Sequence, residues 1–175
     1  MKHIRSILSA VMIMGLIALI SCSKSSNSTS GNFSLDGTSY KVTDISAGAY
    51  QVYGNTSDGA TSLHLAFPGT IGSQNTANYL PHSGTYYVVY STSYTSLPAD
   101  SVMTVTAYIN GSGGVTSYRS TDSAWNGTQN VANGRVTVTL ANGIVNVSGS
   151  GIGVQDGVTS PPKLNFSFGG GYHWP

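Results

Sequence analysis

Charged side chains are scarce in this sequence, and glutamate is absent. Lysine, arginine and aspartate together make up 7% of the 175 residues, and the whole chain has a formal net charge of +1. From Cys22 onward there are five basic and six acidic side chains. Because no basic stripe is present to neutralise a phosphate backbone, the composition argues against nucleic acid as a partner. Solubility must come from serine, threonine, asparagine and glycine.

Residues that build metal and catalytic sites are few and dispersed. The histidines show neither the His-x-His nor the His-Glu-x-x-His spacing that holds zinc. The Asp-Gly pairs are typical of turns, and no Asp-x-Asp-x-Asp run supplies the oxygens that calcium needs. No Gly-x-Ser-x-Gly elbow presents a serine nucleophile. We therefore expect no metal, no cofactor and no enzyme activity, with a hydrolase as the minor alternative.

The first 21 residues have the pattern of a cleaved signal peptide. Lys2 and Arg5 precede an apolar run over residues 11–20, which is interrupted by Gly15, and the small residue Ser21 follows. A basic start, a short apolar middle and a small residue at the exit are typical of secretory signals. The run is too short for a membrane span, which needs about 20 apolar residues.

The single cysteine of the chain lies directly after this segment. Leu19-Ile20-Ser21-Cys22 resembles the lipobox of bacterial lipoproteins, in which the cysteine receives a diacylglycerol and becomes the first residue of the mature chain. The resemblance implies lipidation of Cys22 and a membrane partner through the anchor. Several acyl chains would make that anchoring stable.

The sequence predicts three parts: a signal peptide over residues 1–21, the lipidated cysteine with a flexible tether over 22–30, and one domain over 31–175. The tether is rich in serine and lacks apolar residues, so we expect a mean reach of about 15–18 Å. No Asp follows Cys22, which favours the outer membrane by analogy with enteric lipoproteins. The side of that membrane stays open.

The domain has the composition and periodicity of β-strands. Asn142-Gly143 predicts a two-residue turn that pairs Val138 with Val147 on an apolar face and Thr139 with Asn146 on a polar face. Asp36-Gly37 predicts a similar hairpin. Other strands are expected from the alternation of Leu63, Leu65 and Phe67, of Met103, Val105, Ala107 and Ile109, and of Leu164, Phe166 and Phe168, and over residues 49–56, 84–90 and 115–120. Asn110-Gly111 predicts a further turn.

About nine or ten short strands favour an all-β, antiparallel β-sandwich. A lipocalin-like β-barrel is the alternative, because both folds alternate inward and outward residues. Gly149, Gly151 and Gly153 predict a bulge or a bend rather than a phosphate loop.

Aromatic residues are the best indication of a ligand. The chain has 11 tyrosines and two tryptophans. Trp125 lies in a polar segment, and Tyr172 and Trp174 lie near the end of the chain. Exposed rings of this kind stack on sugars or contact a protein partner. The alternative is that they belong to ordinary strands and pack on the domain.

Two short patterns concern modification. Asp100-Ser101-Val102 and Asp122-Ser123-Ala124 resemble Bacteroidota O-glycosylation sites, which implies glycans on Ser101 and Ser123. The lipobox, the polar tether that follows it and the strand-rich domain that begins Asn32-Phe33-Ser34-Leu35-Asp36-Gly37 make the chain resemble the small surface lipoproteins of Bacteroidota. We expect a lipid-anchored, non-catalytic binding or adhesion module for a glycan or a protein. A lipocalin-like carrier of a small apolar ligand is the second hypothesis.

Overall fold

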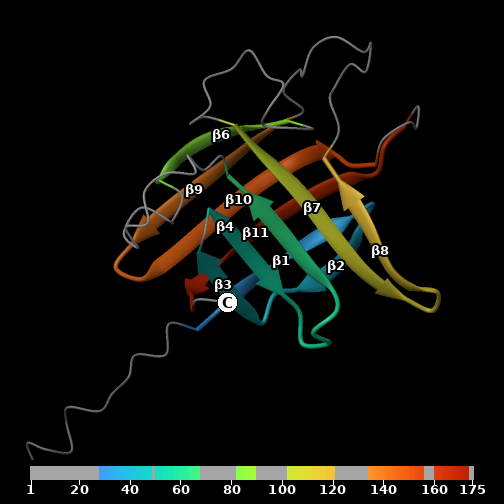
Figure 1. Ribbon diagram of the computed structural model, residues 1–175, viewed down its shortest axis with the longest axis horizontal. Helices are drawn as coiled ribbons and strands as arrows, with labels where there is room; N and C mark the ends of the chain where they lie inside the picture. Colours follow the sequence, from blue (N-terminus) through green and yellow to red (C-terminus); the bar gives the residue numbers. More distant parts are fainter. Residues whose placement is uncertain are drawn as a thin grey trace, which may run out of the picture.

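The described part of the chain consists of β-strands joined by turns. The computed structural model describes residues 28–48, 50–67, 82–89, 102–120, 134–155 and 160–173. These ranges contain eleven strands and no helix (Figure 1). The strands are β1 (Ser30–Leu35), β2 (Thr38–Lys41), β3 (Asp44–Gly48), β4 (Gln51–Asn55), β5 (Ser62–Ala66), β6 (Gly84–Val88), β7 (Val102–Gly111), β8 (Gly114–Arg119), β9 (Arg135–Ala141), β10 (Ile144–Gly153) and β11 (Lys163–Gly171).

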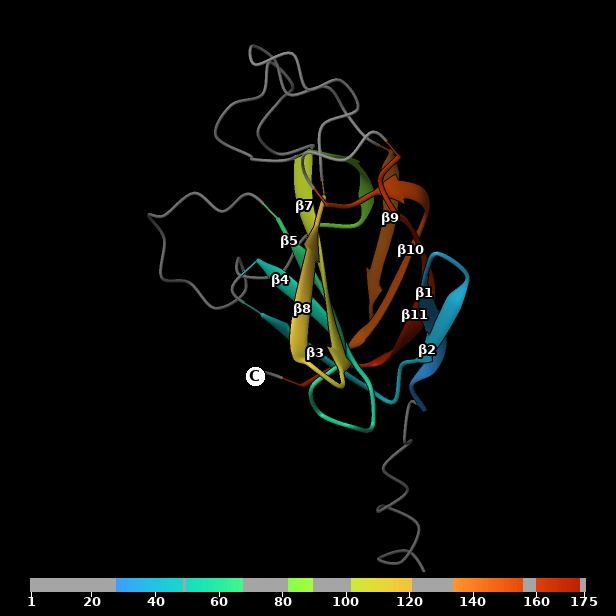
Figure 2. The ribbon, with the colours of Figure 1, turned by 90° about the vertical axis from the view of Figure 1, so that its right-hand side faces the viewer.

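The strands form one sheet that curls into two facing layers (Figure 2). Layer A has the order β2-β1-β11-β10-β9-β6, and layer B has the order β3-β4-β5-β7 with β8 on the far side of β7. The layers join where β6 and β7 run parallel, with Tyr87 opposite Val102. The expectation of a purely antiparallel sheet was therefore wrong. The chain between these two strands is long enough for the crossover that parallel pairing needs.

The predicted hairpins are present in their predicted registers. Val138 pairs with Val147 and Thr139 with Asn146, while Phe33 pairs with Tyr40 across the Asp36-Gly37 turn. The turn residues take the positive φ that such turns need, with 53° at Asn142 and 75° at Gly143. Ala141 and Ile144 lie next to this turn on the outward face, so that face is not wholly polar as the pattern suggested.

Three further expectations are settled by the strand pairing. The bulge predicted from the late glycines occurs between Gly149 and Ile152 on β10. The turn predicted at Asn110-Gly111 lies two residues later, at residues 112–113. Asn110 and Gly111 themselves remain in β7, where they pair with residues of β8. The strand expected over residues 49–56 corresponds to β4, and a strand that was not expected, β3, precedes it across the turn at Tyr50, whose φ is 62°.

Apolar side chains from both layers form one core. Phe33, Leu63, Leu65, Met103 and Leu164 are fully buried in it. The layers approach closely at Gly54 on β4, where an added Cβ would stand 2.8 Å from the ring of Phe168 on β11. The alternating residues predicted to face inward are buried, apart from Ile109, which is half-buried near the end of β7.

The segment after β11 crosses from layer A to the edge of layer B. His173 forms a parallel bridge with Ser46 on β3, and its carbonyl accepts a hydrogen bond of 2.8 Å from the N–H of Ala47. The Nδ1 of His173 also lies 3.4 Å from the Oδ1 of Asp44. This contact covers an edge strand that would otherwise expose unpaired backbone groups.

Candidate functional site

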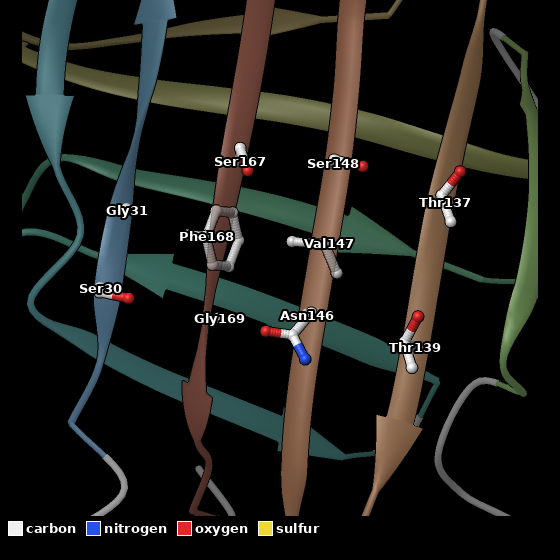
Figure 3. Close-up of a pocket in the computed structure, with 10 residues that line it drawn as sticks. All are labelled: Ser30, Gly31, Thr137, Thr139, Asn146, Val147, Ser148, Ser167, Phe168 and Gly169. Atoms are coloured by element: carbon white, nitrogen blue, oxygen red, sulfur yellow. The ribbon is translucent and has the colours of Figure 1, made fainter.

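A shallow groove crosses the outer face of layer A over strands β1, β11, β10 and β9 (Figure 3). Its volume is about 300 Å³. Two rows of outward residues line it because cross-strand pairing places them side by side. The first row is Ser30, Gly169, Asn146 and Thr139, and the second is Ser167, Ser148 and Thr137.

The groove is hollow because glycine occupies the centre of the first row. Gly169 has no side chain, and the Asn146 amide points toward the space above it (Figure 3). A Cβ on Gly169 would collide with the Oδ1 atom of Asn146. Gly169 therefore holds the floor of the groove open and leaves room for the amide of Asn146.

The polar side chains of the groove have no partners within the described ranges of the chain. Ser30, Thr137, Thr139, Asn146, Ser148 and Ser167 are exposed, and none of their side chains makes a hydrogen bond to another described residue. Hydroxyls both donate and accept, and an amide has two donors and an acceptor. The groove thus offers donors and acceptors to a polar ligand, and its lining contains no titratable side chain.

A second cluster of possible binding residues lies on the outer face of layer B. The ring of His64 on β5 contacts Tyr53 on β4 with ring centroids 4.4 Å apart, and Tyr108 on β7 with centroids 4.5 Å apart. We call these three residues the Tyr–His–Tyr cluster. Burial lowers the pKa of His64. Burial also raises the pKa of Tyr53, and the electrostatic effect of Tyr108 raises it further. On this outward face, His64 is therefore half-buried between the two tyrosine rings.

His64 of the Tyr–His–Tyr cluster also forms, with Ser62, the kind of pair that a hydrolase would use. The Oγ of Ser62 lies 3.1 Å from the Nε2 of His64, two residues further along β5. Among the described residues, none hydrogen-bonds to Nδ1 of this histidine to fix its tautomer. A catalytic base is normally oriented by such a third group. The described residues also contain no group of three metal-ligating side chains.

The residues singled out from the sequence are only partly described. Tyr172 is half-buried and packs against the core, and it follows the groove residue Gly169 by three residues. Cys22, Ser101, Ser123, Trp125 and Trp174 lie outside the described residues. Of the three proposed aromatic ligand residues, the structure therefore describes Tyr172 alone.

Sequence reasoning missed the groove itself. The outward Ser, Thr and Asn of β9, β10 and β11 repeat with a period of two, which marks a solvated face. That signal does not reveal that β1 pairs with β11, because these strands are separated by most of the chain. It also does not identify Gly169 as the residue that opens the groove.

Comparisons with protein-family models, curated proteins and solved structures found no match. Within the described ranges, the chain forms no helix long and apolar enough to span a bilayer.

Proposed function

We propose that this chain is a lipid-anchored protein of the cell envelope whose domain binds a saccharide in the layer A groove without catalysing a reaction. The observation that carries the proposal is the groove of about 300 Å³, whose hydroxyl and amide groups have no hydrogen-bond partner among the described residues. Saccharide hydroxyls both donate and accept hydrogen bonds, as the hydroxyl and amide groups of this lining do. The site needs no cofactor and no ionisable side chain.

The proposed anchor rests on the lipobox resemblance at Cys22, and the lack of an Asp after Cys22 supports the outer membrane as its proposed location. Mass spectrometry of the native protein should find that its first residue is Cys22 and that it carries fatty acid. A mature chain with an unmodified Cys22 thiol would rule out the anchor.

A sandwich fits this function better than a lipocalin-like barrel. A carrier of small apolar ligands needs an enclosed apolar pocket of about 300–1,000 Å³. Here Phe33, Met103 and Phe166 belong to one buried cluster that occupies the space between the layers. The groove, in contrast, is open, and its exposed side chains are polar.

A glycan array tests the proposal with the mature chain that begins at Cys22. Asn146→Ala and the double variant Ser148→Ala/Ser167→Ala should weaken binding of the selected saccharide by about 3- to 10-fold for each neutral hydrogen bond lost. Thr116→Ala on β8 is the matched control, because Thr116 is also an exposed polar residue but belongs to layer B. Equal binding by the groove variants and the parent, or no binding of any saccharide, would contradict the proposal.

A further inference from the structure

The basic side chains of the described residues are unevenly distributed between the two layers. Lys41 on β2, Lys163 on β11 and Arg135 on β9 all point outward from layer A, in the same alternation as the groove residues. Lys41 lies in the row of Asn32, Ser167 and Ser148. Layer B contributes one arginine, Arg119 on β8.

The described acidic side chains do not offset the three cations on this face. The described aspartates are Asp36, Asp44 and Asp58. Asp44 and Asp58 belong to β3 and to the turn before β5, on the layer B side. Asp36 lies in the turn between β1 and β2, where its Oδ1 accepts a hydrogen bond of 3.0 Å from the backbone N–H of Lys163. Counting Asp36, the described residues of the layer A face have a net charge of +2.

The three cations have no carboxylate partner within the described part of the chain. No ion pair links them to an aspartate there. Arg135 is exposed, and its guanidinium carbon lies 4.9 Å from the centroid of the Tyr87 ring on β6. The outer face of layer A therefore carries, outside the groove lining, three positive charges that no described carboxylate pairs with.

The start of β1 connects this face to the anchor. Ser30 is both the first residue of β1 and a lining residue of the groove. It follows Cys22 by eight residues, which span about 29 Å at most when fully extended. If Cys22 is held at the membrane surface, the groove cannot lie farther from the headgroups than this length.

We propose that the outer face of layer A docks on acidic saccharide headgroups of the membrane that holds the anchor. This inference rests on the proposed function and specifies the ligand as a glycolipid headgroup with phosphate or carboxylate groups. The sugar hydroxyls bind the groove between β1 and β9, and the acidic groups bind Lys41, Arg135 and Lys163. Charge complementarity and the short tether both select this ligand over a neutral polymer in solution.

Vesicle co-sedimentation tests the proposal with the mature chain carrying Cys22→Ser, so that no lipid on the protein contributes to binding. The vesicles are phosphatidylcholine alone, or phosphatidylcholine with lipid A, with phosphatidylglycerol or with a neutral galactolipid. We expect the tightest binding to lipid A, a phosphorylated disaccharide, and weakening as salt increases. Each charge removed should weaken binding about fivefold, and Lys41→Gln/Arg135→Gln/Lys163→Gln together about a hundredfold.

The controls separate charge from saccharide recognition. Arg119→Gln removes one charge from layer B and should leave binding unchanged, in contrast to Arg135→Gln. Asn146→Ala should weaken binding to lipid A but not to phosphatidylglycerol. Circular dichroism and thermal melting should show that each variant folds as the parent does.

Three outcomes would overturn the inference. The first is that the protein sediments equally with lipid A vesicles and with plain phosphatidylcholine vesicles. The second is that it sediments equally with vesicles that contain lipid A and with vesicles that contain phosphatidylglycerol. The third is that the triple variant binds lipid A vesicles as fully as the parent does. If soluble saccharides still bind the groove in an Asn146-dependent way, the proposed function stands and the membrane ligand is wrong. If they do not bind either, both are wrong.

Discussion

The hydroxyl of Ser120 donates a hydrogen bond of 2.9 Å to the carbonyl oxygen of Val89, and this bond joins the end of β8 to the end of β6 inside the protein. The same hydroxyl oxygen accepts a hydrogen bond of 3.1 Å from the N–H of Val105 on β7. Ser120 and Val89 are both fully buried. One side chain thus satisfies two buried backbone groups at the junction of the two layers.

Replacing Ser120 with alanine should destabilise the fold. The N–H of Val105 and the carbonyl of Val89 would lose their partner in the buried interior, and each such loss costs about 1–3 kcal/mol. Urea unfolding followed by circular dichroism measures the difference. Ser117→Ala on the exposed part of β8 is the matched control. Equal stability of the Ser120 and Ser117 variants would show that the buried bonds contribute little.

Gly54→Ala should also destabilise the protein, for a steric reason. The added Cβ would lie 2.8–3.2 Å from three atoms of the Phe168 ring, so the two layers would have to separate locally. Overpacking of this kind costs about 1–3 kcal/mol. Gly84→Ala serves as the control, since a Cβ there meets nothing within 4 Å. Phe168→Leu in the Gly54→Ala background should recover part of the loss, and purely additive effects would contradict a direct contact.

His64 should make stability depend on pH. Burial lowers the pKa of its imidazole in the folded state below that of an unfolded chain, which is about 6.5. The unfolded state then binds more protons, so stability is full above this pH and declines as the pH falls below it. Urea unfolding at a series of pH values measures the decline. His64→Gln should reduce it, and an unchanged pH profile in that variant would assign the effect to other groups.

Asp58 should contribute to stability in a different pH range. Its carboxylate accepts hydrogen bonds from the hydroxyls of Thr56 and Thr61 at 2.6 and 2.7 Å, and from the N–H groups of Ala60 and Thr61. These bonds, led by that of the Thr56 hydroxyl, lower the pKa of Asp58 well below its usual range. The stabilising contribution is therefore present at neutral pH and is lost only as the pH falls through the lowered pKa. Asp58→Ala should melt at a lower temperature than the parent at neutral pH, and an identical melting temperature would contradict this role.

Local sequence signals predicted the hairpins but not the way in which distant strands meet. Asn142-Gly143 and Asp36-Gly37 set both the turn and the register, because turn chemistry and side-chain alternation agree there. The parallel pairing of β6 with β7 depends on a crossover and leaves no local pattern. The bridge between His173 and Ser46 on β3 also joins residues that are distant in the sequence, so no local pattern predicts it.

Strand β3 shows why some elements were missed. Ile45, Ser46, Ala47 and Gly48 are all buried, because one side of the strand faces the core and the C-terminal segment pairs at its edge. Burial on both sides removes the alternation by which a half-exposed strand is identified. The small residues also lack the β-branched character of typical strands.

The candidate site was only partly predictable for a similar reason. The polar faces of β9 and β10 follow from the sequence, since Thr139 was expected opposite Asn146. The groove requires β11 and β1 beside them, and these strands come from the two ends of the domain. The sequence suggested Trp125 and Trp174 as ligand residues but did not indicate the Tyr–His–Tyr cluster. That cluster forms only because β4, β5 and β7 pair side by side.

Amide hydrogen exchange of the mature chain, with and without the saccharide selected on the array, tests the groove most directly. We predict that the ligand slows exchange in the segments that contain Asn146, Ser148, Ser167 and Gly169, and leaves the β4, β5 and β7 segments unchanged. Slowed exchange at Tyr53, His64 and Tyr108 with no change in the groove strands would contradict the assignment of the binding site to layer A.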